Sequence, residues 1–248
     1  MDRNRISAGS FDLNKWLFGG YERGIITTLY GPAGSGKTNF CVLAAVSQAK
    51  KGNKVIYIDT EGGFSIERVK QLLGREKDNF EDVLKNIILL KPVNFEEQKK
   101  AFNELLKHLK QSTNIHLIIV DGMTMLYRLE IADARKEEDG EDKVRKVNQE
   151  LAQQLRTLAE IARKREIPII ATNQVYSEFL SREDFESGKE RGVYMVGGNL
   201  LEYWSKCLIE LKNERGKRKA IMRKHRSMPE KELNFIIVDT GIRKRGWI

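Results

Sequence analysis

Residues 31–38 read GPAGSGKT, and this stretch decides the fold of the chain. It matches the pattern G-x-x-x-x-G-K-[ST], whose glycines let the backbone N–H groups converge on an anion. The apolar run 25–30 (IITTLY) predicts a strand before it, and 37–51 predicts a helix after it. A strand, a glycine-rich turn and a helix in this order predict a phosphate-binding loop. Its expected binding residues are Gly31, Pro32, Ala33, Gly34, Ser35, Gly36, Lys37, Thr38 and Asn39.

The same pattern assigns chemistry to particular side chains. The Lys37 ammonium is expected to reach the β- and γ-phosphates of ATP, and the Thr38 hydroxyl to bind Mg²⁺. The run 117–121 (LIIVD) places Asp121 at the end of a buried strand, where ligands bind in parallel sheets, so Asp121 is expected to help hold Mg²⁺. Hydrolysis also needs a base, and Glu61, just after the run 55–59, is the candidate, with Asp59 as its rival.

Apolar runs alternate with amphipathic stretches along most of the chain. Strands are expected at 55–59, 87–90, 117–120 and 168–172, with helices between them. This alternation predicts an α/β fold of the P-loop NTPase kind: a mostly parallel central sheet flanked by helices. Strands at 207–211, 219–223 and 233–238 are separated by short polar turns and predict a C-terminal antiparallel extension. Two polar stretches, 127–142 and 176–198, are interpreted as long functional loops.

Composition narrows the classes of protein. The chain has 248 residues, and no apolar run approaches the ~20 residues that span a bilayer. Its polar start is not a secretory signal, so a cytoplasmic location without a membrane partner is expected. The isolated Cys41 and Cys207 are expected to be buried thiols. The net charge of +9 is concentrated in residues 202–248, which hold 13 Lys and Arg against 6 Asp and Glu, and such a segment is a candidate surface for a polyanion.

Several motifs together resemble the RecA/RadA recombinase superfamily. They are DTEGGF at 59–64, TNQV at 172–175 and GGNLLEYW at 197–204. The resemblance implies one RecA-like ATPase core domain over residues 1–248, with Glu61 as the catalytic base. It also implies that Gln174 senses the γ-phosphate and signals to DNA. The segment 224–230 (KHRSMPE) indicates an archaeal recombinase paralogue rather than the main recombinase.

The chain also departs from the recombinase pattern. We expect it to lack both the N-terminal helical DNA-binding domain and the Phe-x-x-Ala linker that docks on a neighbouring subunit. Residues 224–226 stand where recombinases carry a segment capping the neighbour's ATP. We therefore expect a weak ATPase that does not assemble into long filaments. The implied role is an accessory one in DNA repair and recombination, with single-stranded or branched DNA and the main recombinase or other repair proteins as partners. A monomer and a homodimer both remain open.

The expected DNA contacts follow from the resemblance and from charge. Arg128 lies near the start of the first DNA loop, but the stretches 127–142 and 176–198 carry more acidic than basic residues, which repels a phosphate backbone. The basic tail is therefore the preferred surface, although edge protection or plain solvation would also explain its charge. Its candidate residues are Arg215, Lys217, Arg218, Lys219, Arg223, Lys224 and Arg226, followed by Arg243, Lys244 and Arg245 near the end.

Two other functions fit a RecA-like core. One is a regulatory ATPase of the circadian-clock-like branch, which acts on a protein partner without DNA. The other is a hexameric helicase motor. The segments at 59–64 and 172–175 favour a recombination protein over both. Retention on single-stranded DNA would distinguish a recombination protein from a regulatory ATPase, which would not bind DNA.

Overall fold

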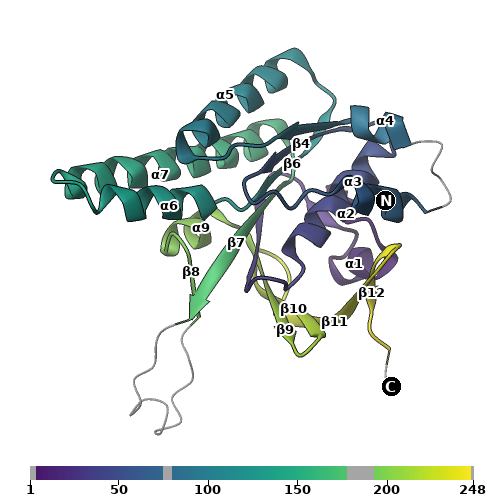
Figure 1. Cartoon of the computed structure of the whole chain (residues 1–248). Coiled ribbons are helices and arrows are strands. Elements are labelled where there is room, and N and C mark those ends of the chain that lie inside the picture. The colour runs from purple at the N-terminus through teal and green to yellow at the C-terminus, as the bar shows by residue number, and fades with distance from the viewer. Residues whose placement is uncertain (1–3, 75–79, 178–192, 247–248) are drawn as a thin grey trace, which may run out of the picture.

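The computed structural model describes residues 4–74, 80–177 and 193–246, and a ten-stranded sheet crosses the middle of this part (Figure 1). The strand order is β12-β11-β10-β9-β3-β7-β6-β4-β5, and β8 pairs with β7 outside this order. The strands are β3 (Ile26–Gly31), β4 (Lys54–Asp59), β5 (Ile87–Leu90), β6 (Ile115–Asp121), β7 (Ile169–Ser177), β8 (Val193–Met195), β9 (Cys207–Glu214), β10 (Lys217–His225), β11 (Lys231–Val238) and β12 (Gly241–Lys244). A separate pair joins β1 (Arg5–Ile6) to β2 (Tyr21–Glu22).

The strands from β9 to β5 pair in parallel, as the alternating sequence pattern predicts. Their side chains alternate between two hydrophobic clusters. On β4, Val55 and Tyr57 belong to the cluster around α2, whereas Ile56 and Ile58 belong to the cluster around α5 and α7. Both faces of this part of the sheet are therefore covered, which explains why its strands read as nearly continuous apolar runs.

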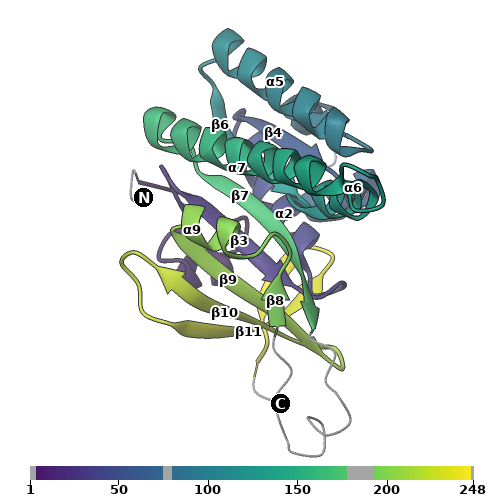
Figure 2. The same cartoon turned by 90° about the vertical axis from the view of Figure 1, so that its left-hand side faces the viewer.

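Helices form a layer on each side of the sheet (Figure 2). One cluster takes side chains from α1 to α4, and the other from α5, α6, α7 and α9. The helix α2 is buried on nearly all sides, because strands, α3 and the C-terminal extension surround it. The helices are α1 (Phe11–Trp16), α2 (Lys37–Ala49), α3 (Ile66–Leu73), α4 (Phe80–Lys85), α5 (Phe95–Gln111), α6 (Met125–Ala134), α7 (Gly140–Arg165) and α9 (Asn199–Trp204).

The C-terminal extension consists of β9 to β12, each antiparallel to the next. It continues the sheet beyond β3 and packs on α2, where the Phe235 ring meets the Phe40 ring edge-on at 5.3 Å between centroids. The predicted antiparallel strands are confirmed. The fourth strand, β12, was not predicted, because its GIRK sequence has only one apolar residue.

The prediction of a long loop at 127–142 is wrong. The helix α6 runs to Ala134 and α7 begins at Gly140, so five residues join two antiparallel helices (Figure 1). The Tyr127 hydroxyl donates to Asn148 Oδ1 at 2.7 Å and ties the two helices together. The exposed turns of both helices are densely charged, and this charge hides the helical period from a reading of the sequence.

The second polar stretch, 176–198, is only partly a loop. The strand β7 continues to Ser177, and β8 returns antiparallel to it with Tyr194 opposite Tyr176. Residues 178–192 of this expected loop lie outside the described residues.

Cys41 and Cys207 are buried free thiols, as expected. Within the described ranges, no helix combines the length and the apolar character that crossing a bilayer requires.

Candidate nucleotide-binding site

The glycine-rich stretch joins the end of β3 to the start of α2. Gly31, the last residue of β3, lies so close to β9 that a Cβ atom there would stand 2.1 Å from the Leu211 carbonyl oxygen. Gly36 caps α2 with a φ of 110°, which favours glycine, and α2 has no side-chain cap. The first N–H groups of α2 are therefore open to an external acceptor, as an anion-binding helix terminus requires.

Lys37 lies inside this loop rather than in solvent. It is 6% exposed, and its Nζ donates to the carbonyl oxygens of Gly31 at 2.9 Å and Pro32 at 3.0 Å. Burial lowers the pKa of Lys37, while the nearby carboxylates of Glu61 and Asp121 partly offset this effect. An ammonium held by two neutral carbonyls is poorly compensated, so a phosphate in the loop would give it a far better partner.

A polar atom without a partner marks the same loop. Ser35 is fully buried, and its Oγ has no hydrogen-bond partner among the described residues. A buried hydroxyl normally finds a partner, because leaving it unpaired costs about 1–3 kcal/mol. Together with the open helix terminus and Lys37, this orphan atom indicates that the loop residues fit a phosphate group.

Asp121 ends β6 beside the loop and is 1% exposed. Its Oδ1 accepts from the Thr172 hydroxyl and its Oδ2 from the Tyr57 hydroxyl, both at 2.7 Å. Burial raises the pKa of Asp121, and the hydroxyl groups of Thr172, Tyr57 and Thr38 act against this rise. The hydroxyl and the carboxylate expected to hold Mg²⁺ thus lie together, and oxygen ligands of this kind suit that ion.

Sequence reasoning missed Tyr57 and Thr172. Tyr57 is fully buried in β4, where a phenol needs a hydrogen-bond partner. A tyrosine inside the apolar run 55–59 could therefore have predicted a polar partner nearby. Thr172 Oγ1 also accepts from the Gly122 N–H at 2.7 Å, so β7 fixes both Asp121 and the turn that follows it.

Glu61 and Gln174 come from distant segments and meet directly. The Gln174 Nε2 in β7 donates to Glu61 Oε2 at 3.0 Å, after a separation of 113 residues in the chain. Burial raises the pKa of Glu61, and the hydrogen bond from Gln174 counteracts part of this rise. The two side chains that the sequence predicts as base and sensor therefore form one unit.

The rival base, Asp59, has a different position. It is 2% exposed, and its two oxygens accept from the backbone N–H groups of Gly63 at 3.1 Å and Phe64 at 2.9 Å. These bonds fold the segment after β4 against Thr38, since a Cβ atom on Gly63 would lie 3.2 Å from the Thr38 hydroxyl. Asp59 holds the loop that carries Glu61, so the geometry favours Glu61 as the base.

Asn173 links this site to the segment around β8. Its Oδ1 accepts from the Thr124 hydroxyl at 2.5 Å, and its Nδ2 donates to the Val196 carbonyl at 2.8 Å. The Val196 N–H donates to the Gln174 carbonyl at 3.2 Å. Hydrogen bonds of Asn173 and Gln174 with Val196 thus connect the nucleotide site to the segment that follows β8.

Comparisons with known proteins agree with this arrangement. A family model described as Rad51 matches residues 3–245. The chain belongs to the Rad51 family. The protein named DNA repair and recombination protein RadB from Methanococcus maripaludis is 41% identical, over 93% of this chain and 96% of that protein. The RadB protein of Methanocaldococcus jannaschii is also 41% identical, over 93% of this chain and 98% of the length of that protein.

A solved structure supports the same assignment. The crystal structure of a RadB recombinase is 34% identical in sequence to this chain and superposes on it with a TM-score of 0.75, over 97% of this chain and 99% of that one. The expected RecA-like fold, with its mostly parallel sheet and antiparallel C-terminal strands, is confirmed. The resemblance to an archaeal recombinase paralogue is confirmed too, with RadB as that paralogue.

In this Rad51-family chain, the predicted DNA contacts fall into two groups. Four tail residues already have partners. Lys219 pairs with Glu232 at 2.9 Å, and Arg223 pairs with Glu210 at 2.7 Å and also with Glu230. Arg226 pairs with Glu22, and the Lys224 ammonium donates to the Glu202 carbonyl at 2.8 Å. The others have no ion pair among the described residues, namely Arg128, Arg215, Lys217, Arg218, Arg243, Lys244 and Arg245. Arg128 is exposed on α6 rather than on a loop.

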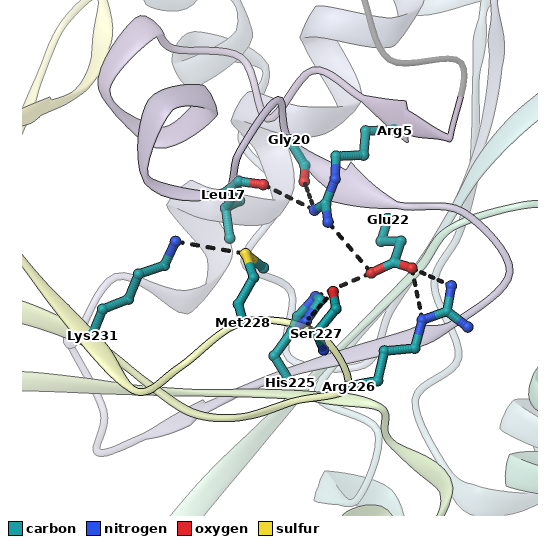
Figure 3. Close-up of polar contacts among 9 residues, drawn as sticks. All are labelled: Arg5, Leu17, Gly20, Glu22, His225, Arg226, Ser227, Met228 and Lys231. Atoms are coloured by element: carbon teal, nitrogen blue, oxygen red, sulfur yellow. Dashed lines mark hydrogen bonds and ion pairs between the residues drawn. The ribbon is translucent and has the colours of Figure 1, made fainter.

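Figure 3 shows how His225 and Arg226, in the segment at 224–226, contact Glu22 of the same chain. The Arg226 Nε donates to Glu22 Oε1 at 2.7 Å, and the His225 Nε2 lies 3.1 Å from Glu22 Oε2. The Ser227 N–H donates to His225 Nδ1 at 3.1 Å, so that nitrogen is an acceptor and Nε2 carries the proton. Sequence reasoning did not foresee that His225 and Arg226 bind β2 of their own chain.

This cluster makes stability depend on pH. The His225 side chain is 1% exposed, and burial lowers its pKa below 6.5 despite the opposing effect of Glu22. The unfolded chain therefore binds the proton more readily, so the contribution of neutral His225 is complete above 6.5 and is lost as the pH falls through this range. We expect the free energy of unfolding, measured with denaturant, to fall on acidification.

The control for this prediction is His225→Gln, whose amide can still donate toward Glu22 but does not titrate. Glu22, Arg5, Arg226 and Lys231 also surround the imidazole, and they remain in the variant. The variant should lose part of the pH dependence. An identical slope in both proteins would show that other groups cause the loss.

Proposed function

We propose that this chain binds ATP with Mg²⁺, hydrolyses it slowly, and binds DNA as an accessory protein of homologous recombination and repair. Residues 1–248 would form a single RecA-like ATPase core. The observation that carries the proposal is the Gln174–Glu61 hydrogen bond, because it joins the phosphate end of the site to the β7–β8 hairpin. The names of the RadB relatives support the repair and recombination role.

Each residue of the proposed site has a definite task. The open N–H groups at the start of α2 and the Lys37 ammonium hold the β- and γ-phosphates. Thr38 and Asp121 would hold Mg²⁺, which would neutralise charge on the phosphate oxygens. Glu61 accepts a proton from the attacking water, and Gln174 keeps the Glu61 carboxylate oriented.

Slow hydrolysis and the partners are part of the same proposal. His225 and Arg226, in the segment at 224–226, are bound within the chain to Glu22, so these side chains are not available to a neighbouring site. The partners proposed are single-stranded or branched DNA and the main recombinase or other repair proteins, with a homodimer as the alternative to a monomer.

A regulatory ATPase that acts on a protein without DNA is the second candidate. The pairing of Lys219, Arg223 and Arg226 with carboxylates favours it, because these cations are less available to phosphates.

The deciding experiment is ATP turnover with Mg²⁺, measured with and without single-stranded DNA on a preparation of known particle mass. We expect slow turnover and retention of the DNA at low salt. Turnover without any DNA retention would favour the regulatory ATPase, and failure to bind ATP would refute both.

A further inference from the structure

A groove lies between α1 and the ends of the C-terminal strands. It has a volume of about 730 Å³ and is lined by α1, the start of β10, β11 and the residues that end β12. Five cationic side chains line it: Lys15, Lys217, Arg218, Lys244 and Arg245. Four of them, Lys217, Arg218, Lys244 and Arg245, belong to the basic tail that the sequence predicts to contact DNA, whereas Lys15 on α1 was not predicted.

The charges of the groove are not balanced. None of the five cationic side chains has an ion pair or side-chain hydrogen bond within the described residues, and the Arg218 Nε is buried without a partner. The two carboxylates of the groove, in contrast, are engaged. Asp12 Oδ2 accepts from the Lys244 backbone N–H at 2.8 Å, and Glu232 pairs with Lys219 at 2.9 Å. The groove therefore offers positive charge that no partner among the described residues neutralises.

An aromatic ring completes the groove. Phe11 stands at the start of α1 and is 80% exposed, although a phenylalanine is normally buried. Proteins that bind single-stranded nucleic acids combine a cationic groove, which follows the phosphates, with exposed rings on which bases stack. A duplex keeps its bases stacked inside and would leave the Phe11 ring without a partner.

We propose that this groove binds single-stranded DNA, with the five cations on the phosphates and Phe11 stacked on a base. This inference rests on the proposed DNA-binding function and places the contact on the α1 side of the tail. The tail residues that are bound to carboxylates are then structural, and Lys15 on α1 joins Lys217, Arg218, Lys244 and Arg245 as a contact.

The test measures binding of a fluorescent oligo-thymidylate by anisotropy, between about 50 and 200 mM salt. The variant Lys217→Glu/Lys244→Glu reverses two exposed, unpaired cations of the groove. We expect its affinity to fall roughly tenfold or more, and the slope of log affinity against log salt to flatten by about 1.4, because each phosphate contact on a single strand contributes about 0.7.

The matched control is Lys91→Glu/Lys110→Glu. Lys91 and Lys110 are also exposed and unpaired in the described structure. Lys91 precedes α5 and Lys110 lies in its last turn, and α5 lies at the opposite end of the molecule from β11 and β12 (Figure 1). The control has the same net charge as the groove variant, so a loss confined to the groove variant supports the proposal. Equal losses in both, or no loss in either, would refute it.

A second variant, Phe11→Ala, separates a strand from a phosphate-only ligand. Its ring is largely in solvent, so we expect the fold to persist, which circular dichroism would verify. Affinity for oligo-thymidylate should fall several-fold, since a stacked base contributes about 1–3 kcal/mol, while affinity for inorganic polyphosphate should not change. Unchanged oligo-thymidylate binding, or a preference for duplex, would overturn the assignment.

The outcomes also separate this inference from the proposed function. If the wild-type protein does not bind oligo-thymidylate even at low salt, both the proposed DNA-binding function and the groove proposal are refuted. Wild-type binding that survives in the groove variant would refute the groove alone.

Discussion

Lys37→Ala is expected to abolish measurable ATP binding. The Nζ atom is the one ammonium group that the described structure places inside the loop, where it now bonds only to the carbonyl oxygens of Gly31 and Pro32. Charge-assisted hydrogen bonds contribute about 1.5–3 kcal/mol each, so losing two of them should weaken binding roughly 100-fold or more. Isothermal titration with ATP and Mg²⁺ measures this loss directly.

A stability measurement provides the control for Lys37→Ala. The variant removes a buried ammonium whose pKa burial lowers, so the free protein should not be less stable than wild type. Added ATP should raise the melting temperature of wild type and of Lys51→Ala, whose lysine is exposed just after α2, but not that of Lys37→Ala. ATP binding of wild-type strength in Lys37→Ala would remove the basis of the proposed site.

Glu61→Gln should separate binding from hydrolysis. A glutamine keeps the size of the side chain and can still bond to Gln174, but it cannot accept a proton from water. A general base contributes about 10²–10⁴-fold to a rate, so we expect turnover to fall at least about 100-fold while ATP affinity stays within about twofold. Single-turnover hydrolysis and ATP titration on the same preparation measure both quantities.

The pH profile and a neighbouring glutamate sharpen this test. Because burial raises the pKa of Glu61 above 4.5, wild-type turnover should begin to fall at a higher pH than it would with an ordinary carboxylate. Glu67→Gln, on the exposed first turn of α3, should leave the rate unchanged. If Glu61→Gln hydrolyses ATP as wild type does, the base must be another group.

The sequence was most informative where burial repeats along an element. β6 and the glycine-rich loop could be predicted, because an apolar run that ends in Asp121 and a spaced set of glycines each have few structural solutions. The predicted β7 stopped too early, since Asn173 and Gln174 look like loop residues. Their side-chain amides donate to the Val196 carbonyl and to the Glu61 carboxylate. Because these partners are distant in the chain, the local sequence does not indicate that Asn173 and Gln174 belong to a strand.

The basic tail shows the same limit for electrostatics. In sequence, Lys219 and Arg223 differ little from Lys217, and all three suggest a polyanion surface. The partners of the first two, Glu232 and Glu210, lie across neighbouring strands, and only the strand register reveals them. Charge counts identify a candidate segment, but only the pairing pattern identifies which of its cations are available.

The position of β3 has a consequence for biosynthesis. This early strand lies between β7 and β9, so both of its edges remain open until much of the rest of the chain has left the ribosome. An exposed strand edge invites pairing with other nascent chains. The hairpins of β9 to β12 are local in sequence and can form quickly once they emerge. The docking of β9 onto β3 then closes the last edge of this strand, so this edge stays open during synthesis until residues 207–214 have emerged.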